Sequence, residues 1–154
     1  MLQIYIPGRG ELEIEELIMD YNGTLAYGGE MIEGLDEKLI TLSEILKLTL
    51  LTADTFGTAE TECSELPLRV EVVEHGLRGK EEYLARNVKH SYIGIGNGNN
   101  DYHLLKQAAI GILVMGSEGC ATQALSVADL LIGSPEEALE LIINPRRLVS
   151  TLHR

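Results

Sequence analysis

The sequence predicts an α/β protein with a parallel sheet and helices on both faces. Three observations predict this class. Short apolar segments of about four to six residues alternate with helical segments of about ten, as in a βαβ series. Apolar residues make up 45% of the chain and charged residues 23%, which is ordinary for a globular protein. At 154 residues the chain fits one domain, residues 1–154, with no repeat or linker.

The first segment predicts a β-hairpin. Apolar and polar residues alternate over residues 2–6, and Pro7-Gly8-Arg9-Gly10 is a turn sequence. A second apolar segment, residues 12–19, runs back and ends at Asp20. Residues 1–16 are therefore expected to form an N-terminal hairpin extension, and Asp20 to end a buried strand.

The later elements follow from apolar spacing and from Gly and Pro punctuation, with a loop at residues 28–29. Strands are predicted over residues 48–51, 68–73, 92–95, 110–115 and 130–132. Helices are predicted over residues 35–46, 58–66, 78–87, 101–109, 119–128 and from 135 onward.

Composition excludes several classes of function. The formal charge of −12 argues against nucleic acid or an anionic membrane as a partner. Cys63 and Cys120 form no paired pattern, which indicates a reducing, cytoplasmic compartment. No signal peptide is visible, and no apolar run approaches the roughly 20 residues of a membrane helix. A soluble cytoplasmic protein is expected.

Three buried strands end in polar clusters, at residues 20–24, 52–55 and 97–101. Each cluster has a structural explanation by itself, since Asp20 can begin a turn and Asp54 can cap a helix. In a parallel sheet, however, ligands bind outside the carboxyl ends of the strands. If the three strands are neighbours, the clusters converge on one crevice.

These clusters suit phosphoryl transfer better than nucleotide binding. Residue 99 is Asn where the dinucleotide fingerprint requires Gly, and the Gly-Lys-Ser/Thr ending of a Walker loop is absent. Phosphoryl transfer needs a nucleophile, a divalent metal and donors for the phosphoryl oxygens. Asp20 fits the nucleophile, Asp20 and Asp101 fit Mg²⁺, and Thr52 and Lys80 fit the phosphoryl oxygens.

With these residues, the chain resembles the haloacid dehalogenase (HAD) superfamily of aspartate-nucleophile phosphotransferases over nearly its whole length after the hairpin. Asp20-Tyr21-Asn22-Gly23-Thr24-Leu25 is similar to the first motif, Thr52 to the second and Lys80 to the third. Residues 96–101, Gly-Asn-Gly-Asn-Asn-Asp, resemble the fourth motif of P-type ATPases, and Thr52-Ala53-Asp54 resembles their Thr-Gly-Asp. The resemblance is therefore to a soluble, P-type-ATPase-like branch. Lys89 and Lys106 are alternatives for the third-motif lysine.

The resemblance implies a HAD-like fold, a phospho-aspartate intermediate on Asp20 and Mg²⁺ as cofactor. It implies a phosphorylated small molecule or phosphoprotein as the substrate. The implied catalytic residues are Asp20, Asn22, Thr52 and Lys80. The implied phosphate-binding residues are Gly23, Thr24, Thr52, Ala53, Lys80 and Asn100. The implied metal ligands are Asp20, Asn22 through its backbone carbonyl, Asn97 and Asp101.

Two positions depart from the family pattern. Asn22 stands where the phosphatases carry a second Asp, the general acid and base, and Asn97 stands where the fourth motif carries an Asp linked to the metal. An amide does not exchange a proton near neutral pH, and positioned proton transfer contributes roughly 10²–10⁴-fold. Slow hydrolysis of alkyl phosphates, a longer-lived phospho-aspartate and weaker Mg²⁺ affinity are expected.

An inserted cap domain is also missing. Only 27 residues separate Thr24 from Thr52, and another 27 separate Thr52 from Lys80. Without a lid, either a large substrate or a neighbouring subunit must exclude water, so a homo-oligomer is one expectation. Two other functions stay open. One is a catalytically weakened module that binds a phosphorylated ligand or partner protein. The other is a sugar-acid phosphate phosphatase, although such enzymes keep the second Asp that Asn22 replaces.

Overall fold

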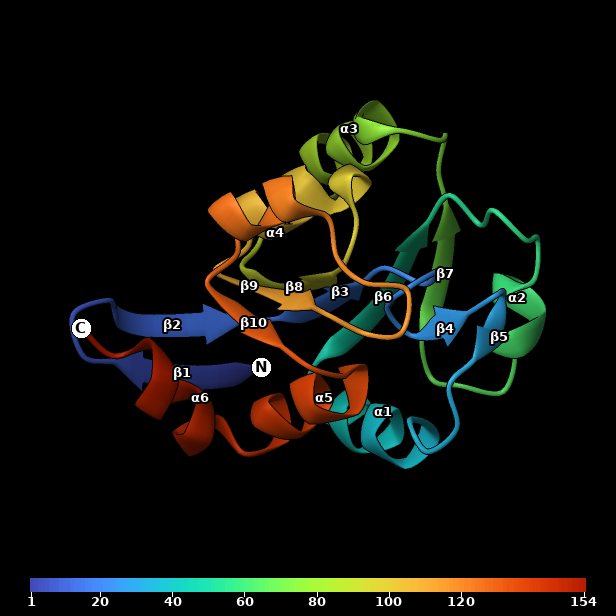
Figure 1. Ribbon diagram of the computed structural model, residues 1–154. Coiled ribbons are helices and arrows are strands. Elements are labelled where there is room, and N and C mark those ends of the chain that lie inside the picture. The colour runs from blue at the N-terminus through green and yellow to red at the C-terminus, as the bar shows by residue number, and fades with distance from the viewer.

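The computed structural model describes residues 1–154 and is built on a six-stranded sheet in the order β10-β9-β8-β3-β6-β7 (Figure 1). All of its strand pairs are parallel. The predicted α/β class is therefore confirmed. From one edge to the other the strands are β10 (Leu130–Ile132), β9 (Ile110–Val114), β8 (Tyr92–Gly96), β3 (Glu16–Met19), β6 (Lys47–Thr52) and β7 (Arg69–Val72).

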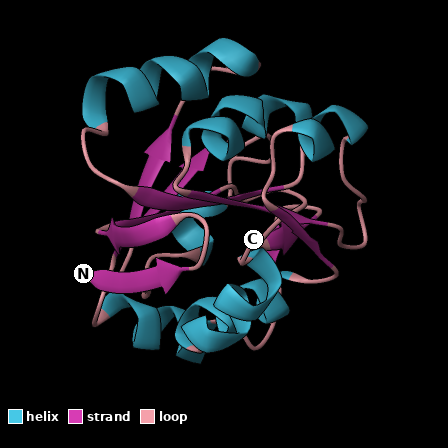
Figure 2. Ribbon diagram, turned by 90° about the vertical axis from the view of Figure 1, so that its left-hand side faces the viewer, coloured by secondary structure: helices cyan, strands magenta, loops and turns pink.

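Helices cover both faces of this sheet (Figures 1 and 2). Successive side chains of a strand point to opposite faces, so β3 contributes to two cores. Leu17 and Met19 join the larger core, and Ile18 joins a smaller one with residues from the helices on the other face. The larger core includes α1 (Asp36–Ser43) and α5 (Pro135–Ile143), and the smaller one includes α3 (Leu77–Asn87) and α4 (Tyr102–Gln107).

The N-terminal hairpin projects from the sheet on the side opposite the carboxyl ends of the strands. It consists of β1 (Leu2–Ile6) and β2 (Gly10–Ile14), paired antiparallel. Since β2 leads directly into β3, the hairpin extends away from the amino end of β3 (Figure 1). The last helix, α6 (Pro145–Leu152), packs against β1. The hairpin is therefore far from Asp20 in its own chain.

Several predicted helices are shorter than expected, because backbone chemistry stops them. The predicted helix from 135 onward is two helices, since Pro145 has no N–H to continue α5 and instead begins α6. The helix predicted over residues 58–66 is only α2 (Ala59–Glu62), which ends well before Pro67. The helix predicted over residues 35–46 is α1, which has 8 residues and is therefore four residues shorter than expected.

Two loops also differ from the predictions. The helix predicted over 119–128 is a single 3₁₀ segment, Thr122–Ser126, and the helix predicted over 101–109 is a 3₁₀ turn, Asn99–Asp101, followed by α4. A second small hairpin, β4 (Ala26–Tyr27) and β5 (Glu30–Met31), surrounds the predicted loop at Gly28 and Gly29. It lies at the carboxyl end of the sheet, immediately after the first polar cluster (Figure 1).

The structure has no helix with both the length and the apolar character needed to cross a bilayer.

Arg9 joins the hairpin turn to the main sheet. Its Nη1 lies 2.9 Å from Asp129 Oδ1, and its Nη2 donates to the carbonyl of Ala109 at 3.0 Å. The Arg9 and Asp129 side chains are only 19% and 23% exposed, so solvent screens the pair incompletely. We expect Arg9→Ala to lower the free energy of unfolding by about 2 kcal/mol, measured by urea denaturation.

Arg78→Ala is the matched control. Arg78 pairs with Glu82 on the surface of α3, with side chains 87% and 49% exposed, so its loss should change stability by no more than about 0.5 kcal/mol. Equal effects of the two substitutions would contradict the role given to Arg9.

Candidate active site

The polar clusters meet where the strand order of the sheet reverses. From β3 the chain moves outward through β6 to β7, and then returns to β8 on the other side of β3. In open α/β sheets, the carboxyl side of such a point is where ligands bind. The backbone N–H of Asp20 donates to the carbonyl of Ile95 at 2.9 Å, so the end of β3 lies against the end of β8. The predicted convergence of the three clusters is therefore present in the fold.

A buried lysine lies between two buried carboxylates at this point. Lys80 Nζ donates to Asp20 Oδ1 and to Asp101 Oδ1, both at 2.6 Å. All three side chains are almost completely buried. The other oxygen of Asp101 accepts the backbone N–H groups of Asn97 and Gly98, at 3.0 and 2.9 Å. These three residues are called the Asp-Lys-Asp triad below.

The first turns of α3 bring Lys80 to the sheet. Gly79 precedes Lys80, and a Cβ there would collide with the backbone carbonyl of Glu74. The glycine thus allows α3 to begin close against the preceding loop. The alternative lysines are elsewhere, since Lys89 donates to the carbonyl of Ala85 and Lys106 lies over the Tyr102 ring.

The triad changes the protonation of its members. Burial is the largest cause that raises the pKa of Asp20, to about 7, and the charge of Asp101 adds to it, although Lys80 opposes both. Burial by itself would lower the pKa of Lys80, but the carboxylates of Asp101 and Asp20 outweigh it, so this pKa is raised. Near neutral pH the ammonium is therefore charged, and the metal-free Asp20 carboxyl has a higher pKa than an ordinary Asp.

Thr52 and Asp54 have different roles at the end of β6. The buried Thr52 Oγ1 accepts the backbone N–H of Asp54 at 2.8 Å, which leaves the hydroxyl hydrogen available to a ligand. Asp54 Oδ1 accepts the backbone N–H groups of Thr58 and Ala59, each at 3.1 Å. Asp54 therefore caps α2, and only Thr52 remains a candidate for the site.

The loop after Asp20 is a tight turn. Gly23 has a φ of +76°, and its N–H donates to the carbonyl of Ala26 at 2.7 Å. Beside it, the side-chain oxygen of Asn22 is buried and has no hydrogen-bond partner. Such an atom is costly to bury, so it is a candidate acceptor or ligand for a group that the site binds.

Asn97 does not present a free side chain. Its Oδ1 accepts from the Thr24 hydroxyl at 3.1 Å, and its Nδ2 donates to the carbonyl of Gly119 at 3.2 Å. Gly119 lies in the loop after β9, although the sequence predicts a helix there, over residues 119–128. Glycine at residues 116 and 119, just after a buried strand, was the available signal for a fourth loop at this edge.

The other predicted phosphate-binding residues differ in burial. Ala53 and Asn100 are partly exposed, whereas Gly23 and Thr24 are buried in the turn that follows Asp20. No hydrogen bond joins Ala53 or Asn100 to the Asp-Lys-Asp triad. Their assignment to phosphate stays a prediction.

The oxygens open to a cation are few. No group of three or more His, Cys, Asp and Glu side chains is arranged to hold a metal. Both oxygens of Asp101 and the side-chain oxygen of Asn97 already accept hydrogen bonds. Asp20 Oδ2 has only a long contact, 3.4 Å, with the Thr24 hydroxyl, and Asn22 Oδ1 has none. This sparse set fits Mg²⁺, which commonly takes one or two carboxylates and completes its shell with water and phosphate.

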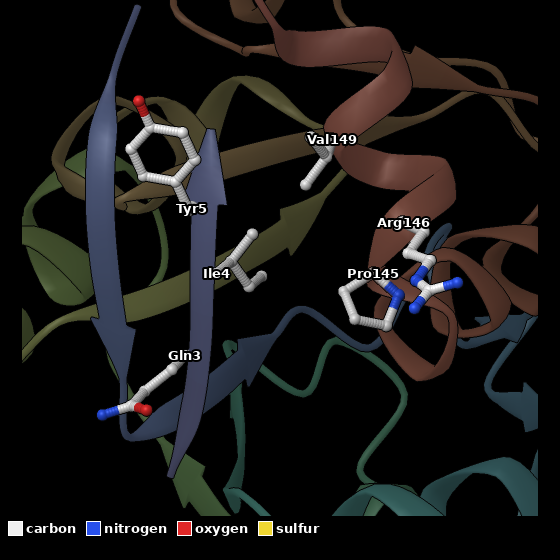
Figure 3. Close-up of a pocket in the computed structure, with 6 residues that line it drawn as sticks. All are labelled: Gln3, Ile4, Tyr5, Pro145, Arg146 and Val149. Atoms are coloured by element: carbon white, nitrogen blue, oxygen red, sulfur yellow. The ribbon is translucent and has the colours of Figure 1, made fainter. Parts of the chain in front are cut away.

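None of the three surface grooves is lined by Asp20, Lys80 or Asp101. Gly79, the residue before Lys80, lines one of them. Another lies between β1 and α6, where Ile4 faces Val149 (Figure 3). Because β1 belongs to the hairpin, this groove is at the opposite end of the sheet from Asp20. At the candidate site the triad's own side chains occupy the space, with Lys80 between Asp20 and Asp101.

Comparisons with known proteins bear on family and fold separately. No family model matches the chain. The uncharacterized protein MJ0073 of Methanocaldococcus jannaschii is 41% identical over 71 residues, which are 46% of this chain and 76% of that protein. The chain belongs to the same family as this archaeal protein.

Solved structures identify the fold. A protein described as a HAD superfamily (subfamily III A) hydrolase from Legionella pneumophila matches with a TM-score of 0.68 at 18% identity, covering 90% of this chain and 87% of that one. The 3-deoxy-D-manno-octulosonate 8-phosphate phosphatase of Moraxella catarrhalis, solved with magnesium, phosphate and the sugar acid, matches at 0.58 and 22% identity, covering 85% and 86%. The fold is thus HAD-like, and it carries no inserted cap domain.

The raised pKa of Asp20 predicts a pH dependence of stability in metal-free buffer. Between the ordinary value of 3.8 and the folded value of about 7, the unfolded carboxyl loses its proton and the folded one keeps it. Ionisation then favours the unfolded state, so the free energy of unfolding falls as pH rises through this window. We expect wild type to lose stability relative to Asp20→Asn from low pH to neutral pH, with a slope no steeper than one proton. Urea denaturation at several pH values measures it.

Asn87→Ala is the control, since Asn87 does not ionise and its amide bonds only to the carbonyl of Tyr83 at the exposed end of α3. Its pH profile should run parallel to that of wild type. If the profile of Asp20→Asn also ran parallel to wild type, the carboxyl of Asp20 would not have the raised pKa.

Proposed function

We propose that this protein is a HAD-superfamily phosphohydrolase or phosphotransferase that works through a phospho-aspartate on Asp20. The observation that supports this most is the Asp-Lys-Asp triad at the point where the strand order reverses. A structural ion pair has little reason to be buried there with a third charged group, since burial of such charges is expensive. The HAD-like fold of the chain agrees with the proposal.

In the first step, a carboxylate oxygen of Asp20 attacks the phosphorus, and the bond from phosphorus to the leaving oxygen breaks. Lys80 Nζ is 2.6 Å from Asp20 Oδ1, so oxygens of a phosphoryl group joined to Asp20 come next to an ammonium. The free hydroxyl hydrogen of Thr52 offers a second donor at the adjacent strand end. Such preorganised donors stabilise the charge of the transferring group.

In the second step, water attacks the phosphorus of the adduct and releases phosphate and the Asp20 carboxylate. A carboxyl at position 22 would assist both steps by giving and taking a proton. Asn22 cannot do so, so the leaving group must depart without help and the adduct persists. This chemistry favours substrates with good leaving groups, or an acceptor other than water.

Mg²⁺ is the cofactor that the open oxygens fit, and Asp20 and Asn22 are the residues placed to hold it. When bound, it would neutralise phosphoryl charge and favour the ionised form of Asp20. Asp101 and Asn97 were predicted as further ligands, but their side-chain oxygens are committed to Lys80, to backbone N–H groups and to Thr24. We propose that they support the site without ligating the ion.

The solved structures support one substrate class as a second candidate. The Moraxella phosphatase acts on a sugar-acid phosphate, which favours a phosphorylated sugar acid as the second candidate function beside a general phosphatase. Asn22 is the residue that separates this chain from that chemistry. The similarity to P-type ATPases rests on the sequence motifs alone, and an oligomer that covers the capless site stays a proposal.

Hydrolysis of p-nitrophenyl phosphate, with and without Mg²⁺, tests the proposal. This ester has a good leaving group and needs little acid catalysis. We expect Mg²⁺-dependent release in wild type, loss of it in Asp20→Asn, and retention in the control Asp54→Asn, which keeps the α2 cap. Undiminished activity in Asp20→Asn would exclude Asp20 as the nucleophile. Binding of BeF₃⁻ without turnover in any variant would favour the alternative of a binding module.

The role of Asn22 has its own test. We expect Asn22→Asp to raise hydrolysis of an alkyl phosphate, such as a sugar phosphate, by roughly 10²-fold or more, because a general acid is restored. Hydrolysis of p-nitrophenyl phosphate should rise much less. Equal acceleration of both esters would show that Asn22 limits the reaction by some means other than proton transfer.

A further inference from the structure

We propose that Asn97 is a positioning residue, which holds the loop after β9 against the turn that carries Asp20, and that it is not a metal ligand. The proposal rests on the proposed function only for its kinetic consequence. The structural part concerns two named loops: the nucleophile loop, residues 20–24, and the loop of residues 115–121, which follows β9.

The side chain of Asn97 connects these two loops with both of its ends. Its carbonyl oxygen accepts from the hydroxyl of Thr24, in the nucleophile loop, at 3.1 Å. Its amide nitrogen donates to the carbonyl of Gly119, in the loop after β9, at 3.2 Å. One planar amide therefore spans the distance between segments 95 residues apart in the sequence, Thr24 and Gly119.

The backbone of Asn97 adds two further connections. Its N–H donates to Asp101 Oδ2 at 3.0 Å, and its carbonyl accepts the N–H of Ala121 at 2.8 Å. The same residue thus contacts a triad carboxylate, the nucleophile loop and the loop after β9. Hydrogen bonds that share a residue in this way limit one another's motion.

Packing holds the amide in place. A Cβ at Gly23 would collide with the Asn97 side chain, so the nucleophile loop lies directly against the amide. Gly23 is buried and Asn97 is partly exposed. A shift of the amide would therefore move the turn that begins at Asp20.

This geometry requires an amide and disfavours a carboxylate. An Asp at position 97 could still accept from Thr24, but it has no hydrogen to donate to Gly119, and its charge would face a carbonyl oxygen. The side-chain oxygen that a metal would need is the one that accepts from Thr24. Thr24 has one hydroxyl hydrogen, and its contact with Asn97, 3.1 Å, is shorter than its contact with Asp20, 3.4 Å.

Without the Asn97 amide, we expect Asp20 to be positioned less accurately for attack. A nucleophile that is displaced by about 1 Å loses about 10²-fold in rate, whereas metal affinity depends on the ligands that remain. Removing the Asn97 amide should therefore lower kcat. The Mg²⁺ concentration for half-maximal activity should stay within about twofold, because the lost group binds no ion.

Hydrogen exchange of residues 115–121 in metal-free protein tests the structural part, independently of any activity. We expect Asn97→Ala and Asn97→Asp both to raise exchange of this loop by about tenfold, the effect of losing about 1.4 kcal/mol of hydrogen bonding. Asn87→Ala is the matched control. Asn87 also donates its amide to a carbonyl, that of Tyr83 at 3.0 Å, but on the exposed end of α3, so exchange of residues 115–121 should not change.

Thr24 provides a second pair of variants. Thr24→Ser keeps the hydroxyl and should retain protection of the loop, whereas Thr24→Val should lose it. The two Thr24 variants therefore test whether the contact between Thr24 and Asn97 holds the loop of residues 115–121, even if the Asn97 variants fold poorly.

The kinetic arm uses p-nitrophenyl phosphate. A fall in kcat of Asn97→Ala with an unchanged Mg²⁺ requirement supports the positioning role. The positioning role would be overturned if Asn97→Ala left exchange of residues 115–121 unchanged and raised the Mg²⁺ requirement tenfold or more. Asn97 would then be a metal ligand. Unchanged exchange in all Asn97 and Thr24 variants would overturn it by itself. If wild type has no activity, the proposed function fails, and the exchange data still decide the role of Asn97.

Discussion

The buried ammonium of Lys80 between Asp20 and Asp101 is the interaction on which the site depends. Two carboxylates packed this closely in a buried pocket repel each other, and the ammonium is what holds them together. Removing one partner of a buried ionic group costs about 3–5 kcal/mol. The pKa of Asp20, raised to about 7, reflects first its burial and then the charge of Asp101, against the opposing ammonium of Lys80.

Neighbouring groups hold the side chains of the triad in this arrangement. Gly79 lets α3 start close to the loop before it, so that Lys80 reaches the sheet, and two backbone N–H groups fix the second oxygen of Asp101. The strands β3 and β8 are neighbours, so Asp20 at the end of β3 lies beside Asp101 in the 3₁₀ turn that follows β8. The N-terminal hairpin extends from the other end of β3, so it does not cover the site of its own chain.

The sequence predicted those features that local patterns encode. Apolar segments with Gly and Pro between them marked the six sheet strands, and strand ends with Asp20, Thr52 and Asp101 marked the convergence of the clusters. Features that depend on distant partners were not predictable. The contact of Asn97 with Gly119 joins residues 22 positions apart, and that of Arg9 with Asp129 joins residues 120 positions apart. Short 3₁₀ segments were also missed, because their apolar spacing resembles that of an α-helix.

Detection of the covalent adduct tests the central claim most directly. Protein incubated with p-nitrophenyl phosphate and Mg²⁺ is quenched in acid and reduced with borohydride, which converts phospho-aspartate to homoserine, and the peptide containing Asp20 is sequenced by mass spectrometry. The account predicts homoserine at position 20 only when ester and Mg²⁺ are both present, and more of it in wild type than in Asn22→Asp. Mg²⁺-dependent turnover with Asp20 unmodified in every quenched sample would contradict it.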